Sequence, residues 1–163
     1  MRDGELRIKQ ATLGDLEGLL RIGDARRQTY AEHQPRFWRP APDAVDRQRS
    51  YVTSLLDDEE TFVLAAKGDD ADLRAFAIGR LVPAPPVYDP GGASCVVDDF
   101  AVADPDEWPT IGPLLLDALR DWAASRGAAQ MIVVTAHLDQ PKRAVLRSRD
   151  LTLASEWWVG PVG

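Results

Sequence analysis

The sequence predicts a single α/β domain, spanning residues 1–163, whose central sheet is mixed and mostly antiparallel. Residues 95–136 read in order as an apolar strand, a short loop, an amphipathic helix and a second apolar strand, a β-α-β unit that requires parallel strands. Residues 61–66 and 73–82 are strand-like runs separated by a short polar turn, which is typical of an antiparallel hairpin. The 163 residues contain no internal repeat and no linker-like stretch, so one domain is expected.

The composition is that of a globular protein, with 45% hydrophobic and 28% charged residues. A net charge of −7 argues against a nucleic-acid partner. The single cysteine, Cys95, excludes an internal disulfide and indicates a reducing compartment. Neither a signal peptide nor an apolar run of membrane length is visible, so we expect a cytoplasmic protein without a membrane partner. No zinc-ligand cluster, Walker lysine or Ser-His-Asp spacing supports a competing chemistry, and no metal is expected.

The N-terminal third predicts one strand and two helices. Residues 5–11 alternate apolar and polar side chains, which indicates a half-buried strand. Thr12 is followed three residues later by Asp15, the spacing of a capping box, so a helix is expected to begin there and to run towards Tyr30. Asp43 is the expected N-cap of a second, short amphipathic helix.

The strand-like run at residues 94–103 carries two adjacent carboxylates, Asp98 and Asp99. Strict alternation places Val96, Asp98, Phe100 and Val102 on one face, and Cys95, Val97, Asp99 and Ala101 on the other. A buried central strand does not normally contain two carboxylates, so each must be paired, hydrated or functional. Gly79, inside the preceding strand, indicates a bulge or a close backbone approach.

The C-terminal part completes the predicted order. A helix opened by Pro109 carries an apolar stripe at helical spacing and stops at Gly127. Residues 131–136 are fully apolar, as expected of a buried parallel strand. Residues 140–149 predict a short basic helix, and residues 152–159 alternate like a last strand. The predicted order is β-α-α-β-β-β-α-β-α-β, with about four helices flanking the sheet.

The segment from Cys95 to Ala136 resembles the acyl-CoA-binding motif of the GNAT-type N-acetyltransferases. In that family a strand ending in Val is followed by a loop with the pattern Arg/Gln-x-x-Gly-x-Gly/Ala and by a long helix. Counted from Val102, the motif places Glu107 at the Arg/Gln position, Thr110 at the first Gly and Gly112 at the final Gly/Ala. A weaker likeness covers most of the chain, so the resemblance implies a single GNAT-like domain.

The resemblance also implies a cofactor, acetyl-CoA or another acyl-CoA, and the residues that hold it. These are the strand residues Phe100, Ala101 and Val102, the loop and helix residues Thr110, Ile111 and Gly112, and the basic-helix residues Gln140 and Arg143. Two departures concern the diphosphate. Pro109 and Pro113 donate no amide hydrogen, and the carboxylate of Glu107 must turn away from the diphosphate or find a cation.

In the family, a carboxylate on the strand often acts as general base towards the amine. The position most often used falls on Val96, and Asp98 lies two residues on, so we expect Asp98 to bind or deprotonate the amine. The alternative, a purely structural role for Asp98, stays open, and Asp99 is expected to be structural. Glu156 is a second candidate for binding the amine. The family's general-acid tyrosine is replaced by Arg147, followed by Ser148, so these two are the candidates beside the thioester sulfur.

The expected acceptor is a small-molecule or peptide amine. Tyr30, His33, Trp38 and Trp157 are the candidate substrate-binding residues. The first three lie on a proline-rich link, where exposed aromatic side chains either cap the core or, by the resemblance, border the acceptor site. The sequence therefore predicts an acyltransferase, and a homodimer through the C-terminal tryptophans is one expected assembly. The alternative is a catalytically silent GNAT-fold binding module whose cofactor loop has decayed.

Overall fold

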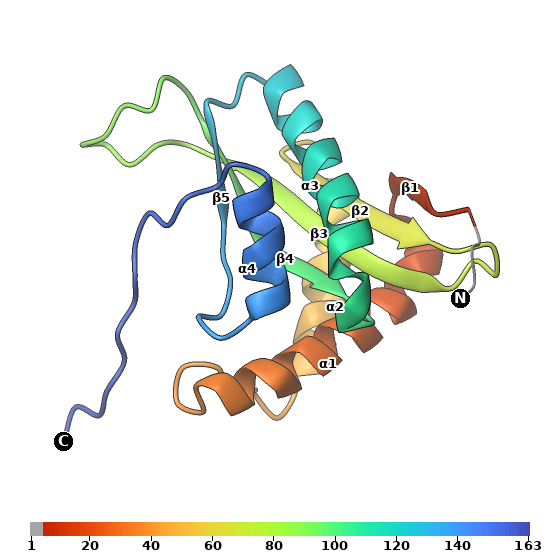
Figure 1. Cartoon of the computed structure of the whole chain (residues 1–163), viewed down its shortest axis with the longest axis horizontal. Coiled ribbons are helices and arrows are strands. Elements are labelled where there is room, and N and C mark those ends of the chain that lie inside the picture. The colour runs from red at the N-terminus through yellow and green to blue at the C-terminus, as the bar shows by residue number, and fades with distance from the viewer. Residues whose placement is uncertain (1–4) are drawn as a thin grey trace.

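The computed structural model describes residues 5–163 (Figure 1). The strands are β1 (Arg7–Gln10), β2 (Thr61–Lys67), β3 (Leu73–Val82), β4 (Ser94–Val102) and β5 (Gln130–Val133), and the helices are α1 (Leu16–His33), α2 (Ala44–Leu55), α3 (Trp108–Ser125) and α4 (Gln140–Ser148). Single 3-10 turns, η1 (Leu13–Asp15) and η2 (Pro105–Glu107), precede α1 and α3. Within this part of the chain, no helix has the length and apolar character that crossing a membrane would require.

The five strands form one sheet in the order β1-β2-β3-β4-β5. All neighbours are antiparallel except β4 and β5, which are parallel, so the predicted mixed sheet is confirmed. Helices α1 and α2 cover one face of the sheet and α3 and α4 cover the other, each pair over its own apolar cluster (Figure 1). The predicted capping box is also present, because the Thr12 amide donates to Asp15 Oδ2 at 2.8 Å.

A β-bulge in β4 changes which side chains share a face. Ile78 pairs with Asp99 and Gly79 pairs with Val97, so Asp98 is the extra residue. The extra residue reverses the alternation, and the predicted faces of this strand are wrong beyond it. Cys95, Val97, Phe100 and Val102 all belong to the cluster beneath α3, and Ala101 belongs to the cluster beneath α1. The bulge lies opposite Gly79, where the sequence indicated one.

The last predicted strand, residues 152–159, is wrong. Helix α4 ends at Ser148, Asp150 beyond its C-cap has a φ of 61°, and the Leu151 amide donates to Leu146 O at 3.0 Å. Leu151 is the last residue to pack against the core, and residues 152–163 are all exposed and run away from the sheet (Figure 1). An alternating segment becomes a strand only where an edge accepts its backbone hydrogen bonds, and in the described part of the chain no strand pairs with this segment.

Candidate active site

Strands β4 and β5 pair over only part of their length and then diverge. Their parallel register runs from Ser94 opposite Gln130 to Val97 opposite Val133. The Val134 amide still donates to Val97 O at 2.9 Å, and the bulge at Asp98 follows immediately on β4. We call this divergence, between residues 98–102 of β4 and residues 134–137 after β5, the fork. The fork lies at one end of the sheet, between its last two strands.

The inner edge of the fork carries main-chain groups of β4. The Ala103 amide donates to Arg74 O of β3 at 2.8 Å, so the groups of Ala101 also point towards β3. Alternation then turns the amides and carbonyls of Phe100 and Val102 to the opposite edge, into the fork. Two of the three predicted backbone contacts, Phe100 and Val102, therefore lie where a ligand in the fork could meet them, and Ala101 does not.

The fork is filled by Lys142, near the start of α4. Its side chain is fully buried, and Nζ donates to Phe100 O at 3.1 Å and to Val134 O at 2.9 Å. Nζ also lies 5.3 Å from the ring centroid of Phe100 and 5.9 Å from that of Trp108. Burial lowers the pKa of the Lys142 amine to about 7, with the nearby Arg26 guanidinium acting in the same direction. A single amine therefore joins the two diverging strands.

The sequence analysis gave Lys142 no role of its own. The available signal was its spacing, because Lys142, Val145 and Leu146 fall at i, i+3 and i+4 on the buried stripe of α4. A lysine on an apolar stripe predicts a buried amine with a specific partner. Arg147, five residues further, lies about 140° around the helix. Arg147 and Ser148 are exposed, and Ser148 Oγ donates to Val145 O at 2.7 Å within the same helix, so neither side chain lies at the fork.

The two carboxylates of β4 have different surroundings. Asp99 accepts a hydrogen bond from Arg26 of α1 at 2.7 Å, and both side chains are largely buried, which fits the structural role expected for Asp99. Arg26 also donates to the carbonyl oxygen of Asp98 at 2.9 Å and so holds the bulge in place. The Asp98 side chain is exposed, and within residues 5–163 its carboxylate has no ion pair. Asp98 is thus the carboxylate at the fork that is free to meet a cationic ligand.

An aromatic cluster borders the fork on the side of α1. Tyr30 donates to Asp139 Oδ2 at 2.6 Å, and Asp139 caps α4 by accepting from the Lys142 amide. Burial and the Asp139 carboxylate raise the pKa of the Tyr30 hydroxyl above its usual range. Ring contacts then lead outward through the pairs Tyr30–His33 (5.7 Å), Tyr30–Trp38 (5.1 Å), Phe37–Trp38 (4.7 Å) and Phe37–Trp157 (5.9 Å). The four predicted substrate-binding residues therefore lie in one cluster, joined by Phe37 of the same proline-rich link. Glu156 lies on the exposed C-terminal segment.

Three amides at the start of α3 already donate within the chain. The Asp106 amide donates to Asp104 Oδ1 at 3.0 Å, and the Glu107 amide to Asp104 O at 2.9 Å. The Trp108 amide donates to Pro105 O, and the following residue is a proline. The carboxylate of Glu107 turns to a cation, as expected, because Arg74 Nε lies 3.2 Å from Glu107 Oε2. This helix start is therefore capped by its own chain.

The predicted motif residues of α3 serve packing. Trp108 is buried and meets the Phe100 ring edge-on at 4.9 Å. A Cβ added at Gly112 would lie 2.9 Å from the Trp108 ring and 3.2 Å from Val145, so close packing of α3 on α4 explains this glycine. Ile111 is fully buried in the core, and Thr110 is exposed. On α4, Gln140 is exposed, and the buried Nε of Arg143 has no hydrogen-bond partner in the described part of the chain.

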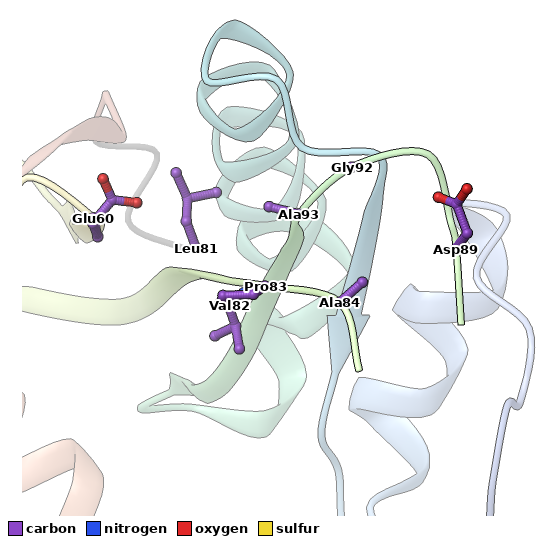
Figure 2. A pocket seen from close by; sticks show the side chains of 8 residues that line it. All are labelled: Glu60, Leu81, Val82, Pro83, Ala84, Asp89, Gly92 and Ala93. Carbon is purple, nitrogen blue, oxygen red and sulfur yellow. The ribbon is translucent and has the colours of Figure 1, made fainter. Parts of the chain in front are cut away.

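Two surface pockets lie away from the fork. The first, of about 480 Å³, lies between the end of β3 and the loop before β4, with an apolar floor and the carboxylates of Glu60 and Asp89 at its sides (Figure 2). The second, of about 390 Å³, lies between the end of β1 and the end of α2. Neither includes a predicted site residue.

Comparison with solved structures shows which fold this is. The chain is similar to a tetramutant of the BH1408 protein from Bacillus halodurans (TM-score 0.82, 14% identity, 96% of this chain and 99% of that chain covered). It is also similar to a predicted acetyltransferase with acetyl-CoA from Clostridium acetobutylicum (0.76, 17%, 97% and 97%) and to the aminoglycoside 6'-N-acetyltransferase AAC(6')-Ih from Acinetobacter baumannii (0.72, 13%, 98% and 100%). No protein-family model and no curated protein sequence matches the chain. The chain has the fold of the GNAT-type N-acetyltransferases.

Proposed function

We propose that this protein is an acyltransferase that moves an acetyl or other short acyl group from acyl-CoA to a primary amine by direct attack. The observation that carries the proposal is the fork, where the main-chain groups of Phe100 and Val102 face a carboxylate-lined and aromatic-lined edge. In a fold shared with a predicted acetyltransferase solved with acetyl-CoA, an open strand edge is suited to pair with the amide groups of a pantetheine arm.

The residues present fit one end of the cofactor better than the other. The strand edge at Phe100 and Val102 fits the pantetheine arm, provided that Lys142 releases Phe100 O. The loop before α3 does not fit the diphosphate, because three of its amides are occupied and three acidic side chains, Asp104, Asp106 and Glu107, surround the helix start. The unpartnered guanidinium of Arg143 is the group we assign to the phosphates.

The chain's own residues supply the proton transfers. Acyl-CoA supplies a thioester carbonyl with a good leaving group. Asp98 pairs with the ammonium of the acceptor and takes its proton, directly or through water, which frees the lone pair for attack. The new C–N bond then forms, the nitrogen loses its second proton to water, and the C–S bond breaks. Lys142 Nζ, at the inner end of the fork, gives a proton to the departing sulfur and regains one from solvent, the role for which the sequence analysis had considered Arg147.

A second candidate function follows from a specific observation. The helix start is capped by Asp104, the Glu107 carboxylate is paired with Arg74, and Lys142 closes the fork. All three are expected if the chain is a GNAT-fold binding module that no longer takes acyl-CoA. In that case the aromatic cluster around Tyr30 and Trp38 would remain as a ligand surface.

Calorimetric titration with acetyl-CoA separates the two candidates, and thiol release over a panel of amines identifies the acceptor. Micromolar affinity together with amine-dependent thiol release supports the transferase. No binding at millimolar acetyl-CoA favours the binding module. On an identified acceptor, Asp98→Asn is expected to lower kcat/KM at least tenfold, whereas Asp117→Asn, on the outer part of α3, leaves it unchanged. A loss of less than tenfold in Asp98→Asn would remove Asp98 from the mechanism.

A further inference from the structure

Arg26 lies on the inner face of α1 and reaches the bulge of β4. Ile22, Arg26 and Tyr30 fall at i, i+4 and i+8, and Ile22 and Tyr30 are buried. Only 18% of the Arg26 side chain is exposed. Its guanidinium donates to Asp98 O at 2.9 Å and to Asp99 Oδ1 at 2.7 Å, and its buried Nε has no hydrogen-bond partner in the described part of the chain. Because a charge on a buried stripe is costly, a specific role is expected for it.

Arg26 and Lys142 approach β4 from helices on opposite faces of the sheet (Figure 1). Lys142 donates to Phe100 O, two residues along the strand from the carbonyl that Arg26 holds, a span of roughly 6.6 Å. A second route also joins the two cations. The Arg26 Cζ lies 5.6 Å from the ring centroid of Tyr30, whose hydroxyl donates to Asp139 Oδ2 at 2.6 Å. Asp139 in turn accepts from the Lys142 amide at 3.3 Å, so Arg26 closes a ring of contacts around the fork.

The charged groups that face the Lys142 amine come from three elements. They are Arg26 of α1, Asp98 and Asp99 of β4, and Asp139 at the start of α4. Burial lowers the pKa of the Lys142 amine to about 7, and Arg26 acts in the same direction, whereas the three carboxylates oppose it. Arg26 and Asp99 form an ion pair, but their charges act on the amine with opposite signs. Removal of one charge or the other should therefore move the titration of Lys142 in opposite directions.

We propose that Arg26 is a positioning residue that couples the two proton-transfer groups of the fork, the carboxylate of Asp98 and the amine of Lys142. Through Asp98 O it fixes the bulge that presents the carboxylate to the acceptor amine, and through the ring of contacts it acts on Lys142 at the inner end. Arginine suits this task because its planar guanidinium donates to two acceptors at once and stays charged throughout the titration of the other groups. The roles of Asp98 and Lys142 rest on the proposed function, but the coupling itself can be measured without a cofactor.

NMR of the free protein, labelled with ¹³C at the Cε carbon of lysine, measures the coupling directly. The chain contains three lysines, Lys9, Lys67 and Lys142, and the signal that disappears in Lys142→Met identifies Lys142. Its titration midpoint is expected to rise by about 0.5–1 pH unit in Arg26→Met and to fall in Asp99→Asn. Loosening of the fold alone would expose the amine and raise the midpoint in both variants. The two opposite shifts therefore separate the coupling from a merely structural role.

The matched control is Arg21→Met, on the same helix. Arg21 also donates to a strand carbonyl, Leu73 O of β3 at 3.1 Å, but it makes no contact with the ring around the fork, so the Lys142 midpoint should not change. Arg26→Met leaves the Asp99 carboxylate without its cation and could fail to fold. The double variant Arg26→Met/Asp99→Asn removes both charges, and its midpoint is expected to lie above that of Asp99→Asn by the same 0.5–1 pH unit, roughly.

Kinetics test the other half of the proposal. On an acceptor identified by thiol release, Arg26→Lys is expected to keep the Lys142 midpoint and to lower kcat/KM about tenfold, because an ammonium does not reproduce the two-pronged hold on the bulge. In Arg26→Met, the alkaline limb of the pH profile of kcat/KM should move upward together with the NMR midpoint.

A Lys142 midpoint that stays within about 0.2 pH unit of wild type in both Arg26→Met and Asp99→Asn overturns the coupling. So do shifts of the same sign in these two variants. A kcat/KM of Arg26→Lys within twofold of wild type overturns the positioning of Asp98. A wild-type chain that releases no thiol with any amine refutes the proposed function, and the NMR midpoints still decide whether Arg26 is coupled to Lys142.

Discussion

Lys142 offers the most quantitative test of how the fork is built. The perturbation is Lys142→Met, which keeps the length of the side chain and removes the amine. Burial lowers the pKa of the folded-state amine from 10.5 to about 7, assisted by Arg26 and opposed by Asp139, Asp99 and Asp98. Above about pH 7 the folded protein therefore binds fewer protons than the unfolded chain. The free energy of unfolding must rise with pH from about 7 to about 10.5, whereas below about 7 both states hold the proton and this slope vanishes.

The magnitude follows from the linkage relation. With folded and unfolded pKa values of about 7 and 10.5, integration from pH 6 to pH 8 gives a gain of about 1.4 kcal/mol for wild type relative to Lys142→Met. The absolute stability of the variant is a poorer measure, because Phe100 O and Val134 O lose their donor at a cost of roughly 1–3 kcal/mol each while the buried charge is removed. The change with pH of the stability difference between wild type and Lys142→Met reports the titration of the amine alone.

Urea unfolding followed by tryptophan fluorescence, at about pH 6, 7 and 8, measures this difference. Lys9→Met, which removes an exposed lysine from β1, is the control and should show no comparable change of the difference with pH. The reasoning would be refuted if the difference in free energy of unfolding between wild type and Lys142→Met stayed constant within about 0.3 kcal/mol, or fell, as the pH rises. The amine would then not be buried as a titrating group between the diverging strands.

Two further substitutions test the start of α3. Gly112→Ala is expected to destabilise the fold by about 1–2 kcal/mol in urea unfolding, because the new Cβ would lie 2.9 Å from the ring of Trp108 and this crowding outweighs the gain in helix propensity. The control Gly14→Ala, whose new Cβ has its nearest contact at 3.5 Å, should change the free energy of unfolding little. A Gly112→Ala variant of unchanged or increased stability would contradict the close packing of α3 on Trp108. Glu107→Gln removes a carboxylate from the start of α3 and is expected to tighten acetyl-CoA binding about threefold to tenfold in calorimetry. The control Glu17→Gln, on α1, should leave the affinity for acetyl-CoA unchanged. Weaker binding by Glu107→Gln would show that the Glu107 carboxylate does not repel the cofactor.

Element identity was readable from the sequence wherever a periodic pattern coincided with a local signal. The capping spacing of Thr12 and Asp15, the hairpin turn before β3 and the apolar stripe of α3 each combine the two, and each prediction is confirmed. The sequence did not predict which side chains of β4 share a face beyond Asp98. The run around Asp98 alternates acceptably with or without one extra residue, and only the pairing with Gly79 decides between the two registers.

Two other features depend on long-range contacts that a single sequence does not encode locally. Residues 152–159 alternate like a strand, but a strand also needs a neighbouring edge, and the pattern says nothing about where that edge lies. Lys142 reads as one of several cations on a basic helix until the fork supplies two carbonyl acceptors for it. The aromatic residues from Tyr30 to Trp38 were singled out because bulky rings on a proline-rich link must meet one another or a ligand. Their rings contact one another, and their role in substrate binding stays a prediction.

The two edges of the β4–β5 strand pair are satisfied in different ways. Backbone groups at a sheet edge must be satisfied by the chain, by water or by a partner. At the inner edge, the chain provides Lys142, a single long side chain that a ligand can displace without disturbing the ladder between Ser94 and Val97. At the outer edge, beside Met131 and Val133, no strand among residues 5–163 pairs with β5. A small ligand is therefore suited to the inner edge, whereas the groups of the outer edge are left to water.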